Sequence, residues 1–153
     1  MKKNLEIEKR ILLKRMPTVN FNEIQRINQY YCPNGRFREV LSNGKVKYIK
    51  TIKSTISIGV NHEVNSEISK EIFLKEKKKA TKFLSKMRYI KNVGKYKWEV
   101  DVFTELNLII AEIEVKTKKE LHTVKIPPFI GKQMIMDITG IKQFSNYNLA
   151  DKI

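Results

Sequence analysis

Four pairs of like charges, each separated by a single residue, recur along this 153-residue chain. Two pairs are acidic and two are basic: Glu6 with Glu8, Glu112 with Glu114, Arg36 with Arg38, and Lys86 with Arg88. Carboxylates are the ligands that hard cations such as Mg²⁺ and Mn²⁺ prefer, and guanidinium and ammonium groups suit phosphate oxygens. The four pairs therefore indicate chemistry on a phosphate compound with the help of a divalent cation.

A β-strand is the element that would use this spacing, because residues i and i+2 lie on the same face of a strand. The residue between the two charges is apolar in every pair, namely Ile7, Ile113, Phe37 and Met87. A half-buried antiparallel sheet also alternates polar and apolar residues. Like charges side by side repel, however, so a sheet with no use for them mixes the signs. The pattern predicts a sheet with one charged face that binds something and one apolar face that packs on a core.

A longer series of motifs runs through the chain from residue 6 to residue 150. It consists of Glu6-Ile7-Glu8-Lys9-Arg10, Gln29-Tyr30-Tyr31, Arg36-Phe37-Arg38, Thr51-Ile52-Lys53, residues 63–68, Lys86-Met87-Arg88-Tyr89, and residues 98–103, 111–114 and 145–150. This ordered series resembles the motifs of the CYTH, or triphosphate tunnel metalloenzyme, superfamily, whose hallmark is an N-terminal Glu-x-Glu-x-Lys. Any one motif is a weak signal, whereas the ordered series is a specific one.

The resemblance implies an α+β fold in which a closed antiparallel β-barrel of eight strands carries covering helices. The charged faces would line a hydrophilic tunnel open at both ends, and the apolar faces would lie under the helices. Closing the barrel also removes the exposed edges of the sheet. The length suits one domain over residues 1–153, since domains commonly hold about 100–150 residues.

The resemblance also implies roles for individual residues. The groups expected to bind the phosphates are Arg10, Arg36, Arg38, Lys53, Lys86 and Arg88. The groups expected to hold Mg²⁺ or Mn²⁺ are Glu6, Glu8, Glu112 and Glu114. The groups expected to act in catalysis are Lys53, Lys86, Tyr31 and Glu63, of which Glu63 would orient ligands or water. For Asp101 we expect an ion pair with an arginine of the tunnel.

The implied function is metal-dependent hydrolysis of the terminal phosphate of inorganic tripolyphosphate or of a nucleoside triphosphate. One alternative is an adenylate cyclase of the class IV type, which needs a base and ribose pocket that the sequence does not reveal. Another is a protein that binds polyphosphate or nucleotides without catalysis. Two departures from the family motifs leave the substrate and the metal preference open: Asn65 replaces an acid, and Gln133 stands where the family tends to have Glu.

The net charge of +15 raises the question of nucleic-acid binding. The expected tunnel set holds six basic and six acidic residues, with Glu63 and Asp101 among the acids, so the excess lies outside. It gathers notably in Lys75, Lys77, Lys78, Lys79 and Lys82 of the helix expected at residues 69–85, where a solvated helix face explains it. Weak, salt-sensitive RNA binding remains an alternative.

The composition also bears on where the protein works. No apolar run approaches the roughly 20 residues that cross a membrane. No apolar stretch that could act as a signal peptide follows Met1-Lys2-Lys3. Cys32 is the only cysteine, which excludes an intrachain disulfide. We therefore expect a cytoplasmic protein with a small triphosphate substrate and no membrane partner; the oligomeric state stays open.

Turn residues and periodicity predict the remaining elements. Asn43-Gly44 is typical of a hairpin turn. It would join two strands, at residues 36–41 and 46–53. Further strands are predicted at residues 96–103, 108–115 and 122–126, and helices at residues 69–85 and 146–151, with a short helix that begins at Asn20 or Asn22 and ends near Asn28.

Overall fold

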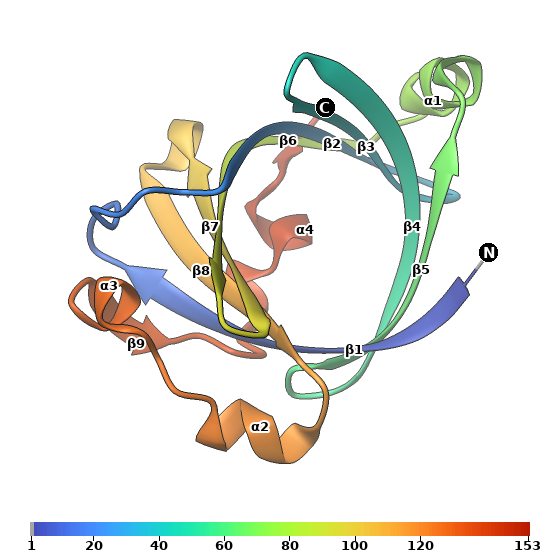
Figure 1. The fold of residues 1–153 in the computed structure, drawn as a ribbon. Coiled ribbons are helices and arrows are strands. Elements are labelled where there is room, and N and C mark those ends of the chain that lie inside the picture. Colours follow the sequence, from blue (N-terminus) through green and yellow to red (C-terminus); the bar gives the residue numbers. More distant parts are fainter. Residues whose placement is uncertain (1) are drawn as a thin grey trace.

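The computed structural model describes residues 2–153, and its main feature is a closed barrel of eight antiparallel strands (Figure 1). In chain order the strands are β1 (Lys2–Leu13), β2 (Glu23–Cys32), β3 (Gly35–Ser42), β4 (Lys45–Ser57), β5 (Val60–Ile68), β6 (Lys82–Val93), β7 (Tyr96–Phe103) and β8 (Leu108–Val115). Around the barrel the order is β6-β2-β3-β4-β5-β1-β8-β7, and pairing of β6 with β7 closes the ring. The predicted eight-stranded barrel is confirmed.

Short elements surround this barrel. Two strands extend the sheet, because β9 (Met134–Asp137) pairs with β1 and β10 (Asp151–Lys152) pairs with β6. The helices are α1 (Lys70–Lys77), η1 (Thr104–Leu106), α2 (Lys118–Thr123), α3 (Pro128–Gly131), η2 (Lys142–Phe144) and α4 (Asn146–Leu149). Within residues 2–153, no helix is long and apolar enough to cross a membrane.

The main apolar core lies on the outside of the barrel, beneath α2 and α3. Ile7 and Ile113, two of the apolar residues between paired charges, are buried there with Trp98. Leu121 of α2 and Ile130 of α3 complete this cluster. The alternation read from the sequence thus places the charged residues on the opposite, inner face of β1 and β8.

A second apolar cluster lies at one end of the barrel interior. Leu84 and Phe103, from the inward faces of β6 and β7, pack there against Ile138 and Ala150. The segment from residue 138 to residue 150 carries η2 and α4, and α4 appears within the ring of strands in Figure 1. The C-terminal segment therefore covers part of one end of the tunnel.

The helix predicted at residues 69–85 is much shorter in the structure. Ser69 caps α1 by accepting a hydrogen bond from the backbone N–H of Ile72, but the helix ends at Lys77 and β6 begins at Lys82. Only Phe73 of α1 is buried, so this helix has little apolar surface with which to extend. Residues 82–93 instead pair with β2 and β7, which overrides the local helical pattern. The lysines of α1 are exposed, as predicted.

Three further predictions of local structure differ from the fold. Residues 23–32, which include the predicted helix end at Asn28, form strand β2 because β3 and β6 flank them. Residues 118–123 form α2 rather than part of a strand at 122–126, since the Thr117 side chain caps a helix there. The C-terminal helix ends at Leu149, and Asp151 already belongs to β10. The Asn43-Gly44 turn is confirmed, with φ angles of 52° and 74°.

Candidate active site

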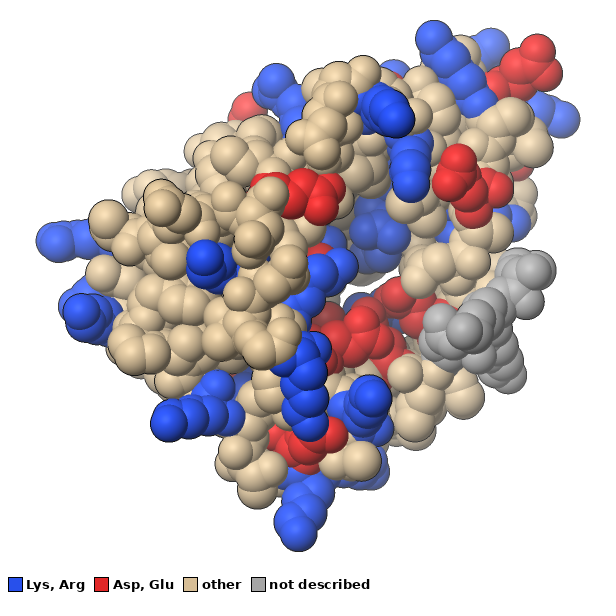
Figure 2. All heavy atoms as spheres, in the orientation of Figure 1, with Lys and Arg blue, Asp and Glu red and all other residues tan. Residues whose placement is uncertain are grey.

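The barrel interior contains a cavity of about 1450 Å³ lined by side chains from all eight barrel strands. This volume exceeds the roughly 300–1,000 Å³ of ordinary small-molecule pockets. Ile141, Ser145 and Tyr147 of the C-terminal segment line it at the covered end. Figure 2 shows the hollow, with acidic side chains inside it and many lysine and arginine side chains on the surrounding face.

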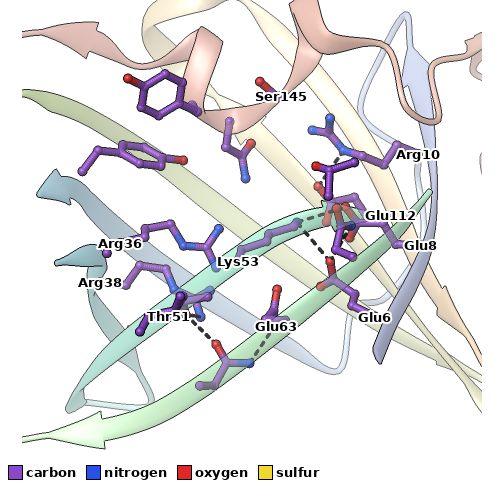
Figure 3. Close-up of a pocket in the computed structure, with 18 of the residues that line it drawn as sticks. Glu6, Glu8, Arg10, Arg36, Arg38, Thr51, Lys53, Glu63, Glu112 and Ser145 are labelled. Atoms are coloured by element: carbon purple, nitrogen blue, oxygen red, sulfur yellow. Dashed lines mark hydrogen bonds and ion pairs between the residues drawn. The ribbon is translucent and has the colours of Figure 1, made fainter. Parts of the chain in front are cut away.

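The charges in the cavity are separated into two walls. We call one the acidic wall; its residues come from the consecutive strands β5, β1, β8 and β7 and are Glu63, Glu6, Glu8, Glu112, Glu114 and Glu99. We call the other the basic wall; its residues come from β6, β3 and β4 and are Arg88, Arg36, Arg38 and Lys53. Figure 3 shows Arg36 and Arg38 on one side of the cavity and Glu6, Glu8 and Glu112 on the other.

Arg36 and Arg38 on the basic wall have no acidic partner among the residues that the structure describes. The Nε atom of each is buried without a hydrogen-bond acceptor. Burial, and then repulsion from Arg36 and Arg88, lower the pKa of Arg38 to about 9. Buried guanidinium nitrogens without acceptors are unfavourable until an anion joins them. The basic wall is therefore suited to bind an anion.

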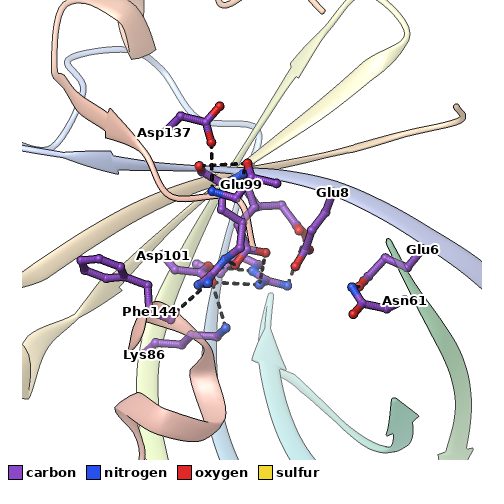
Figure 4. Close-up of polar contacts among 12 residues, drawn as sticks. Glu6, Glu8, Asn61, Lys86, Glu99, Asp101, Asp137 and Phe144 are labelled. Carbon is purple, nitrogen blue, oxygen red and sulfur yellow. Dashed lines mark hydrogen bonds and ion pairs between the residues drawn. The ribbon is translucent and has the colours of Figure 1, made fainter. Parts of the chain in front are cut away.

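Lys86 lies behind the basic wall in a buried ion-pair cluster (Figure 4). Its ammonium is 2.8 Å from Asp101, whose carboxylate also accepts two hydrogen bonds from Arg88, at 2.8 and 2.9 Å. Burial lowers the pKa of Lys86 to about 8, whereas both cations hold the pKa of Asp101 far below its usual range although burial alone would raise it. The expected pairing of Asp101 with an arginine is confirmed, but Lys86 does not line the cavity as its predicted phosphate contact requires.

Arg10 lies on the acidic wall, bound mainly to the protein itself. Its Nε donates to Glu112 at 3.1 Å, and its Nη1 donates to the carbonyl of Phe144 at 2.6 Å. Only Nη2 is buried without a partner. Arg10 thus ties the C-terminal segment to β1 and β8 and keeps one donor for a ligand.

Glu6 and Glu8 lie on one face of β1 and share Lys53 as a nearby cation. Lys53 is 3.0 Å from Glu6 and 3.6 Å from Glu8. Burial, followed by repulsion from Glu8, raises the pKa of Glu6 to about 8, and burial followed by repulsion from Glu112 raises that of Glu8 to about 7. A further cation at this wall would relieve that repulsion.

The acidic wall fits a divalent cation in its donor atoms and in its charge. Carboxylate oxygens suit Mg²⁺ and Mn²⁺, and the high pKa values of Glu6 and Glu8 show that burial and the neighbouring carboxylates disfavour their negative charge. Glu112 is already paired with Arg10, and Glu114 lines the cavity with an exposed side chain. Within residues 2–153, no three Asp, Glu, His or Cys side chains converge as a preformed metal site. Carboxylates would have to close around an ion.

Some residues of the cavity had no role assigned to them from the sequence motifs. Thr51, Asn61 and Glu99 line it, and each lies two residues from a charged residue on the same strand face, which is the signal that could have found them. Tyr31 lines it as predicted and accepts a hydrogen bond from Gln29 at 2.8 Å. Gln133 follows α3 outside the barrel and does not line the cavity, so its departure from the family pattern does not alter the tunnel.

No known family model matches the chain, and no curated protein matches its sequence. Solved structures do match it. The inorganic triphosphatase NE1496 is 21% identical with a TM-score of 0.61, over 97% of this chain and 95% of that one. A candidate adenylate cyclase from Bacillus halodurans is 15% identical with a TM-score of 0.61, over 94% and 99% of the two chains. HpAC1 from Hippeastrum, a proposed adenylyl cyclase with a dominant triphosphatase activity, is 12% identical with a TM-score of 0.50, over 81% and 98%. The chain therefore shares the barrel fold of these proteins, which is the fold that its ordered motifs predicted.

Proposed function

We propose that this protein hydrolyses the terminal phosphate of inorganic tripolyphosphate or of a nucleoside triphosphate, with the help of Mg²⁺ or Mn²⁺. The observation that carries the proposal is the division of one cavity into a basic wall, on which Arg36 and Arg38 have no acidic partner among the described residues, and an acidic wall of closely spaced carboxylates. The structural similarity to NE1496, an inorganic triphosphatase, supports it.

The basic wall would bind the phosphate groups. Arg36 and Arg38 have free donors for phosphate oxygens, and charge-assisted hydrogen bonds contribute about 1.5–3 kcal/mol each. Arg88 is held in place by Asp101, so it would meet the ligand in a fixed orientation. An anion at this wall would also relieve the mutual repulsion of the three guanidinium groups.

The acidic wall would hold the divalent ion through Glu6, Glu8, Glu112 and Glu114. When bound, such an ion supplies neutralisation of charge on the phosphoryl oxygens. Lys53 is the basic-wall residue that pairs with Glu6 and Glu8, so it would contact both carboxylates and phosphate. Glu63 accepts a hydrogen bond from Asn65 at 2.7 Å, which holds it in position to orient ligands or water.

We expect Mn²⁺ to stabilise the protein more at high pH than at low pH. The pKa values of Glu6 and Glu8 are about 8 and 7 in the folded chain, above the ordinary 4.5. The unfolded chain loses these protons at lower pH, so the two carboxyls weaken the fold as the pH rises from about 4.5 to about 8. Mn²⁺ displaces the same protons, so its effect on Tm should be larger at about pH 8.5 than at about pH 6.

Thermal unfolding with and without Mn²⁺ at both pH values measures this difference. In Glu8→Gln the pH dependence of the Mn²⁺ effect should shrink. In Glu71→Gln, a change on the exposed surface of α1, it should remain. A Mn²⁺ effect on Tm that is the same at both pH values would contradict a site on the acidic wall.

The products formed from ATP and from tripolyphosphate test the reaction itself. With Mg²⁺ or Mn²⁺, ³¹P spectra should show ADP and orthophosphate from ATP, and pyrophosphate and orthophosphate from tripolyphosphate. A cyclase would instead form cyclic AMP and pyrophosphate from ATP and leave tripolyphosphate intact. Tight binding of both compounds without turnover would indicate a binding protein.

The same assay locates the reaction in the tunnel. Arg38→Ala should lower catalytic efficiency about ten- to a hundredfold for both substrates, because it removes charge-assisted hydrogen bonds to phosphate. Lys79→Ala should leave efficiency unchanged, since Lys79 lies outside the barrel near Glu76. Equal losses in the two variants would favour an external anion-binding surface instead.

A further inference from the structure

Asn65 lies on β5, where the acidic wall meets the basic wall. Its Oδ1 accepts a hydrogen bond from the Thr51 hydroxyl at 2.5 Å, and its Nδ2 donates to Glu63 at 2.7 Å (Figure 3). Thr51 in turn accepts a hydrogen bond from Arg38 at 3.2 Å. One neutral amide therefore connects an arginine of the basic wall to a carboxylate of the acidic wall.

The directions of these hydrogen bonds require an amide at position 65. A guanidinium only donates, so Thr51 accepts from Arg38 and gives its own proton to Asn65. An ionised carboxylate only accepts, so the group that faces Glu63 must donate. A carboxylate at position 65 could accept from Thr51 but would repel Glu63 unless a proton or a cation lay between them.

The groups around Glu63 already occupy part of its capacity to bind an ion. Asn65 donates to it, and the carboxyl group of Glu6 lies within hydrogen-bonding contact of it. Lys53 is its direct partner across the β4–β5 ladder. Glu8, by contrast, has its nearest cation, Lys53, at 3.6 Å, and its direct partner across the β1–β8 ladder is another carboxylate, Glu114. An ion would thus be drawn toward β1 and β8 and away from Glu63.

We propose that Asn65 confines divalent-ion binding to the carboxylates of β1 and β8, so that the tunnel binds a single ion and Glu63 remains a positioning group. The inference rests on the proposed metal-assisted function. It predicts that Asn65→Asp, which exchanges the amide for a carboxylate of nearly the same shape, creates a second ion site. The introduced carboxylate would form that site together with Glu63 and Glu6.

Counting the Mn²⁺ ions bound per chain tests the inference. Electron paramagnetic resonance of free Mn²⁺ during a titration should give one bound ion for the natural protein and two for Asn65→Asp. Asn28→Asp is a matched control on the outer face of the barrel. Asn28 likewise accepts from a hydroxyl, that of Ser85 at 2.9 Å, and donates to a glutamate, Glu39 at 3.2 Å. This control should still bind one ion, because no third carboxylate completes a site there.

The outcomes separate this inference from the proposed function. Two ions bound to the natural protein, or one ion bound to a folded Asn65→Asp variant, would overturn the role of Asn65 and leave the hydrolase proposal intact. No ion bound to the natural protein would overturn the metal-assisted function itself. If Asn65→Asp fails to fold, the count for the natural protein still decides, since one ion supports the inference and two refute it.

Discussion

Replacing Glu8 with glutamine is expected to lower phosphate release by about a hundredfold or more while the barrel stays folded. We expect the charge of Glu8 to be needed at the acidic wall, yet its pKa of about 7 shows that burial and the nearby Glu112 disfavour that charge. Glutamine keeps the shape and removes the repulsion from Glu112. The Tm at about pH 8 should therefore stay the same or rise.

Phosphate release and thermal unfolding of the same preparation measure both effects. Excess chelator should reduce the natural protein to the level of Glu8→Gln. Glu112 is a poorer choice for this test, because its removal would strand the buried guanidinium of Arg10 and disturb the fold as well. Full turnover by the natural protein in excess chelator would refute the role of a divalent ion.

Asp101→Asn is expected to destabilise the fold by about 3–5 kcal/mol, the largest effect on stability that the structure suggests. Asp101 is fully buried and is the carboxylate between Lys86 and Arg88, so the change leaves two buried cations without their counter-charge. Urea unfolding at about pH 7 measures the loss. Glu99→Gln is the matched control; Glu99 also pairs with Arg88, at 3.3 Å, but is partly exposed, so it should lose about 1 kcal/mol or less.

The loss in Asp101→Asn should shrink as the pH rises. Burial already lowers the pKa of Lys86 to about 8, below the ordinary 10.5, and without Asp101 it falls further. The folded chain then releases the lysine proton at lower pH than the unfolded chain does, so stability rises with pH over a wider window than in the natural protein. A loss below about 1 kcal/mol at neutral pH would show that the ion-pair cluster does not hold β6 to β7.

The sequence alone determined which face of each strand is charged. Alternation at a spacing of two predicted that Ile7 and Ile113 pack on a core and that their acidic neighbours share the opposite face, and the structure confirms it. That the charged face lines a tunnel was implied by the family resemblance and not by the alternation. Asn43-Gly44 predicted its hairpin because only a few residue types adopt positive φ angles easily. These features follow from backbone geometry within a few residues.

Predictions from local sequence were wrong where pairing between distant strands competes with local helix formation. Residues 82–85 suit a helix that continues from α1, and residues 23–28 suit a short helix of their own. Both became strands because the ring is complete only when β2 lies between β3 and β6. The closed sheet satisfies backbone hydrogen bonds along the whole of β2 and β6, which local helical propensity could not offset.

Which tunnel charges neutralise one another was decided only by the tertiary structure. Arg10 pairs with Glu112, 102 residues away in the sequence. Lys86 is buried in an ion pair with Asp101, whereas Arg38, of the same charge, has no acidic partner among the described residues. The two-residue alternation predicts only which face of a strand a side chain lies on. It does not predict which side chain of another strand lies next to it, so all the inward-facing charges look equivalent in the sequence. Neighbours depend on the register between strands distant in the chain. That register separates the cations bound within the protein from the arginines left free for an anion.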